Sequence, residues 1–221
     1  MLTIVGPLCT DSDTYLHREF ENTQGLLIAL DGGIKLLRRV GKLPDLWFGD
    51  MDSASPDEIT ALERKEVKIF QYPTEKDYSD FELALQYLES HHHFSQVSFY
   101  GMLGGRLDHM LINLALVKAY LPDLDKLCFH SQTLDIYLIN SKNTLTLSSL
   151  PGRLVSLIPF EENIEVISTS GLKYPLIHDI LKPGSSRGLS NVCIANEVSI
   201  KIMKGNLLVF HYKEDDDENI S

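Results

Sequence analysis

The sequence predicts an α/β architecture in its first half and an antiparallel β architecture in its second half. Through about residue 120, short apolar runs alternate with helical spacing, which is typical of βα units stacked around a mostly parallel sheet. After about residue 130, strand-like segments follow one another without helical spacing. Pro122 is expected to end the last helix. We therefore expect an α/β domain over residues 1–128 and a β-sandwich-like domain over residues 129–213.

Five apolar runs are expected to form the strands of the first domain: residues 2–5, 26–30, 46–48, 67–72 and 97–100. Two of the intervening helices begin with a capping box, in which a serine caps the first turn and a glutamate three residues later reaches back to the cap N–H. These boxes are Ser55-Pro56-Asp57-Glu58 and Ser79-Asp80-Phe81-Glu82. Asp80 thus lies in the first turn of a helix, where the helix dipole favours anions.

The second domain is expected to consist of six strands. They cover residues 134–139, 144–147, 154–159, 164–168, 198–203 and 207–212. Lys204-Gly205-Asn206 separates the last two and predicts a hairpin turn. Residues 214–221 carry a run of acidic side chains without apolar partners, so we expect a disordered tail there.

The composition narrows the classes of function. The 221 residues include 20 basic and 31 acidic side chains, and the formal charge of −11 argues against a broad surface for nucleic acid or anionic lipid. No apolar run reaches the roughly 18 residues that a membrane helix needs. The N-terminus lacks the pattern of a secretory signal, which favours the cytoplasm. Cys9, Cys128 and Cys193 form no CxxC pair, so neither a disulfide framework nor a zinc knuckle is indicated.

Two acidic pairs follow expected strands. Asp50 and Asp52 come directly after the apolar Leu46-Trp47-Phe48, at a strand end where open α/β sheets bind ligands. Such a pair is weak evidence alone, because aspartates also cap helices and make turns. Lys76-Asp77-Tyr78-Ser79-Asp80 adds two more carboxylates at a helix entrance. Carboxylates in successive loops are suitable ligands for Mg²⁺, which completes its octahedron with water and substrate phosphates.

Two glycine-containing junctions follow further strands. Gly104-Gly105-Arg106 lets backbone N–H groups approach phosphate oxygens, which the arginine can also bind. Asp31-Gly32-Gly33 could approach a nucleotide in the same way. Neither junction is a Walker A loop or a GxGxxG fingerprint. Four such loops at successive strand ends predict one ligand site at a single edge of the sheet.

The chain resembles the thiamine pyrophosphokinases in the order and spacing of six motifs. They are DGG at 31–33, GDMDS at 49–53, KDYSD at 76–80, GGRLDH at 104–109, GLKYPL at 171–176 and SRGLSN at 186–191, which is similar to the family's SxGxSN segment. The resemblance runs from about residue 28 to residue 210.

The resemblance implies transfer of the pyrophosphoryl group of ATP to thiamine, with AMP as the other product, Mg²⁺ as cofactor and a homodimer with active sites between subunits. It also implies a set of site residues. The expected metal ligands are Asp50, Asp52 and Asp80, and the expected catalytic residues are Asp77, Asp80 and Arg106. Either Asp77 or Asp80 is expected to orient the thiamine hydroxyl and accept its proton. The ATP-binding residues are Asp31, Gly32, Gly33, Lys76, Gly104, Gly105 and Arg106. The thiamine-binding residues are Asp108, Ser168, Tyr174, Ser190 and Asn191, with Tyr174 where the family carries an aromatic residue that stacks on thiamine.

Two other functions are compatible with parts of the pattern. A phosphohydrolase of the haloacid dehalogenase type would use Asp50 as nucleophile and Asp52 as acid and base, but in that class the pair follows the first strand and continues with Thr or Val after one residue. A binding module without turnover would keep the nucleotide or thiamine loops, although it would not need every carboxylate together with Arg106. A phosphoaspartate at Asp50 would indicate the first, and ATP-dependent formation of AMP would exclude the second.

Overall fold

The computed structural model describes residues 1–8, 10–52, 54–91, 94–121, 124, 126–160 and 163–213. The chain divides into two compact units. Unit 1 comprises Met1–Leu124 and Phe129–Ser131, and unit 2 comprises Asp125–Cys128 and Gln132–Ser221. Cys9, Ser53, Pro122 and the acidic tail over residues 214–221 lie outside the described residues. Among the described residues, no helix is both long and apolar enough to cross a membrane.

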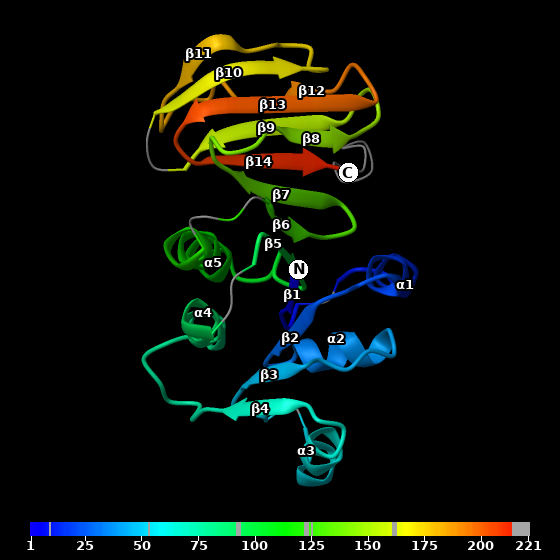
Figure 1. The fold of residues 1–221 in the computed structure, drawn as a ribbon. Helices are drawn as coiled ribbons and strands as arrows, with labels where there is room; N and C mark the ends of the chain where they lie inside the picture. Colours follow the sequence, from blue (N-terminus) through cyan, green and yellow to red (C-terminus); the bar gives the residue numbers. More distant parts are fainter. Residues whose placement is uncertain are drawn as a thin grey trace. The chain divides into compact units, whose positions relative to one another are not determined.

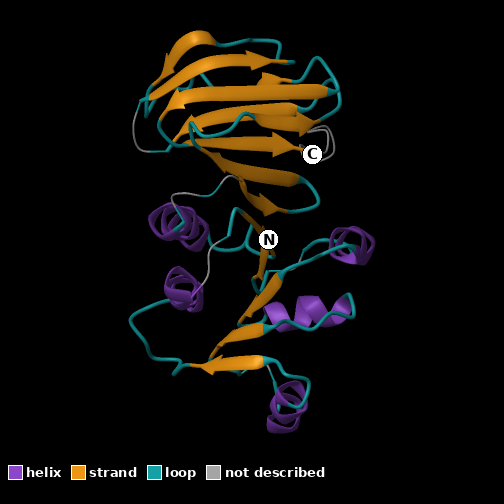
Figure 2. Ribbon diagram, viewed as in Figure 1, coloured by secondary structure: helices purple, strands orange, loops and turns teal. Residues whose placement is uncertain are grey.

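Unit 1 is built around a parallel sheet with the strand order β5-β1-β2-β3-β4 (Figure 1). The strands are β1 (Leu2–Val5), β2 (Leu26–Leu30), β3 (Leu46–Gly49), β4 (Lys68–Gln71) and β5 (Gln96–Tyr100). The helices are α1 (Asp13–Glu21), α2 (Gly33–Arg39), α3 (Pro56–Glu63), α4 (Asp80–His91) and α5 (Leu107–Tyr120). Figure 2 shows α4 and α5 on one face of the sheet and the other three helices on the opposite face. Apolar side chains on both faces of the central strands are therefore buried.

Local sequence signals explain where two of these helices begin. The Ser55 hydroxyl accepts from the Glu58 N–H at 3.3 Å while the Glu58 carboxylate accepts from the Ser55 N–H at 2.8 Å, so the expected capping box of α3 is confirmed. The Ser79 hydroxyl accepts from the Glu82 N–H at 3.1 Å and caps the first turn of α4. This cap fixes Asp80 as the first residue of the helix.

Unit 2 pairs two antiparallel sheets. One contains β12, β9, β14 and β7 in that order, with β6 beside β7, and the other has the order β11-β10-β13-β8. The bounds are β6 (Lys126–His130), β7 (Leu134–Ile139), β8 (Leu145–Ser148), β9 (Leu154–Pro159), β10 (Ile164–Ser170), β11 (Ile177–Leu181), β12 (Asn191–Val192), β13 (Glu197–Lys204) and β14 (Leu207–Tyr212). Alternate residues of β8 and β13 are buried in a common apolar core. The expected fold class, an α/β half followed by an antiparallel β half, is confirmed.

Three strands were not expected from the sequence. β6 lies in the stretch that was interpreted as a boundary, because its apolar run is short. β11 is mostly exposed and lacks the alternation that identifies a strand, and its His178 adopts a φ of 48°. β12 is only two residues long.

A close approach of the backbone explains one glycine of the DGG segment. A Cβ on Gly33 would lie 2.1 Å from the carbonyl oxygen of Val5, so only glycine lets the start of α2 pass β1 this closely.

Candidate active site

The structure brings three carboxylates together at the carboxyl ends of β2 and β3. Asp31, Asp50 and Asp52 each place a carboxylate oxygen within 4.8 Å of the others. Asp31 follows β2 and Asp50 follows β3, and these neighbouring parallel strands end at the same edge of the sheet. Carboxylate oxygens at this separation can bind one hard cation. We call this group the acidic cluster.

Backbone geometry and hydrogen bonds hold the acidic cluster. Asp31 adopts a φ of 45°, and its carbonyl oxygen accepts from the Trp47 indole N–H at 2.9 Å. Asp50 Oδ1 accepts from the Asp52 N–H at 3.1 Å, and Asp50 Oδ2 accepts from the Thr74 hydroxyl at 3.1 Å. The protein thus orients the Asp50 carboxylate and fixes the backbone at Asp31 before any ligand binds.

The pKa values of the acidic cluster shift in opposite directions. Burial raises the pKa of Asp31, and the negative charges of Asp50, Asp52 and Asp80 add to this effect. The hydrogen bond from the Asp52 N–H lowers the pKa of Asp50, helped by Thr74 and Lys76. The site therefore gathers negative charge whose mutual repulsion a bound cation would relieve.

Asp80 adds a fourth carboxylate from the start of α4. Its Oδ1 atom is buried and has no hydrogen bond, although the Lys76 Nζ lies 3.3 Å away. The Lys76 ammonium instead donates to the Pro73 carbonyl oxygen at 3.0 Å. This buried oxygen forms an ion pair with Lys76 and accepts no hydrogen bond, so Asp80 keeps lone pairs with which it can bind a cation.

Two cavities in unit 1 share Asp31. The larger has a volume of about 490 Å³, and the smaller has about 420 Å³. Of the predicted site residues, the larger is lined by Asp31, Lys76, Asp77, Asp80, Gly104 and Arg106. The smaller is lined by Asp31, Gly32 and Asp52 together with two cations of α2, Lys35 and Arg39. The other predicted site residues of unit 1 line neither cavity: Gly33, Asp50, Gly105 and Asp108.

Arg106 and Asp108 pair with each other at the entrance to α5. Arg106 Nε donates to Asp108 Oδ1 at 3.1 Å, and Arg106 Nη2 donates to Asp108 Oδ2 at 2.5 Å. This guanidinium lowers the pKa of Asp108 to about 2. Both side chains are more than 60% exposed, so the pair is open to exchange for a ligand.

In unit 2, Asn191 holds the backbone on both sides of Tyr174. The Asn191 Oδ1 accepts from the Tyr174 N–H at 3.0 Å, and the Asn191 Nδ2 donates to the Tyr174 carbonyl oxygen at 2.7 Å. Asn191 is buried, whereas Tyr174 is 59% exposed. Asn191 thus fixes the backbone at Tyr174, while Ser168 and Ser190 are exposed on β10 and beside β12.

Sequence reasoning missed three polar contributors to the cavities of unit 1. Thr74 orients Asp50, and Lys35 and Arg39 line the smaller cavity. Lys35 comes two residues after Asp31-Gly32-Gly33, so its place in the first turn of α2 was a usable signal. Thr74 carries no such signal, because its contact with Asp50 spans two strands.

Comparisons with known proteins identify the family. The model for the catalytic domain of thiamin pyrophosphokinase matches residues 17–127, and the model for its vitamin B1 binding domain matches residues 140–207. The thiamine pyrophosphokinase of Bacillus subtilis is 31% identical over 195 residues, which cover 83% of this chain and 86% of that protein.

Solved structures agree with these matches. The crystal structure of the Bacillus subtilis thiamine pyrophosphokinase aligns with a TM-score of 0.79 and 26% identity, covering 96% of this chain and 99% of that one. The yeast thiamin pyrophosphokinase, at 18% identity and a TM-score of 0.71, covers 96% of this chain and 85% of its own and shares the fold. The chain therefore belongs to the thiamine pyrophosphokinase family.

Proposed function

We propose that the protein transfers the pyrophosphoryl group of ATP to thiamine, forming thiamine diphosphate and AMP. Family membership supports the reaction, and the observation that carries the proposal is the acidic cluster, which lies beside Asp80 and a cavity of about 490 Å³. ATP brings a polyanionic triphosphate into a protein that is itself acidic, and negative charge moves onto the departing AMP, so the reaction requires a cation and converging donors.

We further propose that Mg²⁺ is the cofactor and that Asp50, Asp52 and Asp80 hold it, with Asp31 beside them. The fit rests on the donor set, which is made of hard carboxylate oxygens, and on the buried Oδ1 of Asp80, which has no hydrogen bond. When bound, Mg²⁺ supplies positive charge that stabilises the phosphate oxygens in the transition state.

Residues of the chain itself position the phosphates. Arg106 binds phosphate oxygens after releasing Asp108, and Lys76 supplies a second positive charge on the cavity wall. At Gly104 and Gly105, with φ values of 98° and 65°, the absence of a side chain lets the backbone approach the phosphates. Gly32, which lines the smaller cavity, does the same for the nucleotide, while Gly33 lets the start of α2 pass close to β1.

We assign to Asp77 the role of orienting the thiamine hydroxyl and accepting its proton. The sequence leaves Asp77 and Asp80 as alternatives for this role. Asp80 is next to Lys76 and has a buried oxygen suited to a cation, whereas Asp77 is exposed and lines the same cavity. Asp77 can therefore orient the hydroxyl and accept its proton as the oxygen attacks the β-phosphorus of ATP.

For thiamine recognition we propose that Tyr174 stacks on the substrate, that Asn191 holds Tyr174, and that Asp108, Ser168 and Ser190 supply hydrogen bonds. Stacking on an aromatic ring contributes about 1 kcal/mol beyond area burial. Following the family resemblance, we also propose a homodimer with active sites at the subunit interface and a place in the cytoplasm.

The test is an assay with purified protein, thiamine, ATP and Mg²⁺, in which AMP and thiamine diphosphate are quantified by chromatography. Equal amounts of the two products, both lost with EDTA, are the expected result. ADP with thiamine monophosphate would contradict the proposal and indicate transfer of a single phosphoryl group. If no thiamine product forms, phosphohydrolase chemistry or binding without turnover becomes the better account.

A further inference from the structure

One end of the β-sandwich of unit 2 is polar where its interior should be apolar. On β14, the inward-facing positions Leu207 and Val209 are completely buried, and the same alternation continues into His211, which is 5% exposed, and Lys213. On the paired strand β7, Asp135 lies directly opposite His211 and is 7% exposed. Burying polar groups is unfavourable unless they have hydrogen-bond or ionic partners, so the contacts of these buried groups need to be identified.

The polar end borders an open cavity of about 500 Å³, which we call the basic cavity. Four strands or their flanking residues contribute its charged lining: Lys126, Asp135, Arg153 and Lys213. Three cationic side chains thus face one carboxylate in a chain whose formal charge is −11. Burial lowers the pKa of His211, so this ring is neutral at pH 7 and adds a hydrogen-bonding group without charge.

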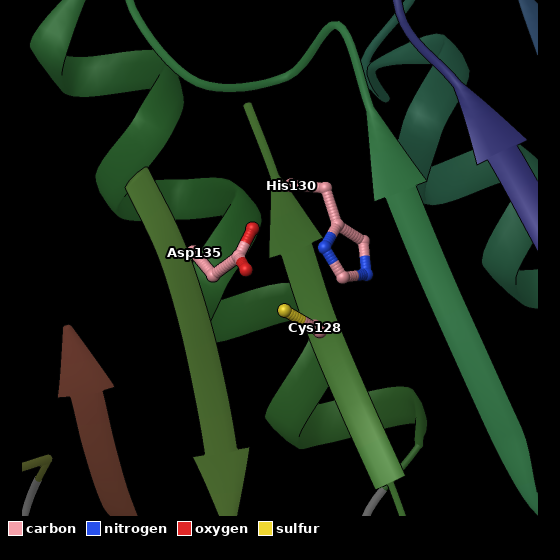
Figure 3. Close-up of side chains that lie close together, drawn as sticks. All are labelled: Cys128, His130 and Asp135. Atoms are coloured by element: carbon pink, nitrogen blue, oxygen red, sulfur yellow. The ribbon is translucent and has the colours of Figure 1, made fainter. Parts of the chain in front are cut away.

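Contacts around Asp135 fix part of the basic cavity. Lys213 Nζ donates to Asp135 Oδ1 at 2.9 Å, and the Tyr137 hydroxyl lies 3.4 Å from Asp135 Oδ2. Figure 3 shows Asp135 on β7 beside Cys128 on β6. Burial and the nearby Asp135 raise the pKa of the Cys128 thiol, which therefore stays protonated and adds no negative charge.

The same groups could be mistaken for a hydrolase triad. The Ser149 Oγ and the His211 Nε2 are 2.9 Å apart, which is hydrogen-bond distance for a nucleophile and its base. However, the Asp135 carboxylate is bound by Lys213 and Tyr137, and the Ser149 hydroxyl also lies 3.2 Å from the Cys193 sulfur. This arrangement presents donors around a space rather than an activated nucleophile.

We propose that the basic cavity binds the phosphate group of a small phosphorylated molecule, with Arg153 and Lys126 as its principal cationic contacts. A phosphate offers acceptor oxygens in several directions and therefore suits donors that converge from different strands. The volume leaves room for an organic part beyond the phosphate. This site lies wholly in unit 2 and does not depend on the activity proposed for unit 1.

Calorimetric titration of the full-length protein with inorganic phosphate, at constant ionic strength and without Mg²⁺, tests the proposal. Arg153→Gln should weaken binding about tenfold, the loss expected for one charge-assisted hydrogen bond. Lys126→Gln, at an exposed position that tolerates substitution, should weaken it about threefold. Lys204→Gln is the matched control, because this exposed lysine of unit 2 does not line the basic cavity. The Lys204→Gln protein should bind phosphate as tightly as the unchanged protein does.

The Asp135→Asn variant separates phosphate binding from a purely structural role of the basic cavity. Removing the one carboxylate raises the positive charge of the basic cavity, so phosphate should bind severalfold more tightly, with folding checked by thermal unfolding. The proposal is overturned if the Arg153 and Lys126 variants bind phosphate as the unchanged protein does. It is also overturned if phosphate does not bind, or if Arg106→Gln alone abolishes binding, because the anion would then occupy unit 1 only.

Discussion

The two units gather polar side chains in opposite ways. In unit 1, Asp31, Asp50 and Asp52 follow the ends of parallel strands and gather negative charge at one edge of the sheet, where Asp31 lines both cavities. In unit 2, cations and hydrogen-bonding groups occupy inward positions at the end of a sandwich and face a cavity as an excess of positive charge. The first arrangement is suited to a cation and the second to an anion.

The difference shows how topology decides which sites can be predicted. Parallel strands carry their following loops to one edge of the sheet, so the order of motifs along the chain already predicts that Asp31 and Asp50 meet. In an antiparallel sandwich, neighbours depend on strand pairing. The juxtaposition of His211 and Asp135 follows from the register of β14 on β7, which no short motif encodes.

The acidic cluster should show the largest effect. Asp52→Asn removes one negatively charged ligand from the proposed metal site, and loss of about 4 kcal/mol of transition-state stabilisation would lower turnover about 10³-fold. The measurement is the rate of AMP and thiamine diphosphate formation at saturating substrates. Asp57→Asn is the control, because this exposed carboxylate of α3 lines neither cavity. Full activity of Asp52→Asn would remove the acidic cluster from the mechanism.

Separating Asp77 from Asp80 sharpens the assignment within unit 1. Asp77→Asn should lower kcat by about 10²-fold and leave thiamine affinity nearly unchanged, as expected when a group acts only in the chemical step. Asp80→Asn should in addition raise the Mg²⁺ concentration needed for half-maximal rate. If Asp77→Asn keeps normal turnover while Asp80→Asn loses it without a change in Mg²⁺ requirement, Asp80 acts on the hydroxyl and Asp77 has neither role.

In unit 2, removing the contact between Asn191 and Tyr174 tests the proposed thiamine-binding residues. Asn191→Ala removes the two hydrogen bonds that fix the backbone of Tyr174, so the KM for thiamine should rise about tenfold while the KM for ATP stays unchanged. Asn196→Ala, at an exposed position, is the matched control. An equal rise in both KM values would instead indicate general damage to the fold, which thermal unfolding would reveal.

Much of the fold could be predicted because its signals are local. The capping box at Ser55 and Glu58 needs only four residues, and the apolar runs of β1, β2 and β3 stand between clear polar segments. β11 and β12 could not be predicted, because exposed or very short strands exist only through pairing with distant partners.

In the candidate site, too, some features could be predicted from the sequence and others could not. The acidic residues were predictable from their positions after strands, and their convergence needed only the topology of a parallel sheet. The mutual pairing of Arg106 and Asp108 was not, because the sequence assigns both to ligands and does not show that they satisfy each other before a ligand binds. Asn191 likewise belongs to a segment that the sequence assigns to ligand binding. Its contact with Tyr174 could not be predicted, because it depends on how β12 is placed.

The smallest expected effect concerns the stability cost of the acidic cluster. Asp31 has a raised pKa because it is partly buried and repelled by Asp50, Asp52 and Asp80. The folded state therefore binds its proton more readily than the unfolded state, and the free energy of unfolding falls as pH rises from the ordinary value toward the raised one. Asp31→Asn abolishes this titration, and its amide oxygen can still accept a hydrogen bond.

Asp31→Asn should consequently be more stable than the unchanged protein at pH 7, by at most about 1 kcal/mol because the carboxylate keeps contact with solvent. The two proteins should be equally stable at pH 3, where Asp31 is protonated. Urea unfolding at the two pH values measures both quantities, and Asp57→Asn should show no comparable gain at pH 7. If Asp31→Asn is more stable by the same amount at pH 3, the effect comes from packing rather than from charge. Repulsion within the acidic cluster would then not lower the stability of the folded state.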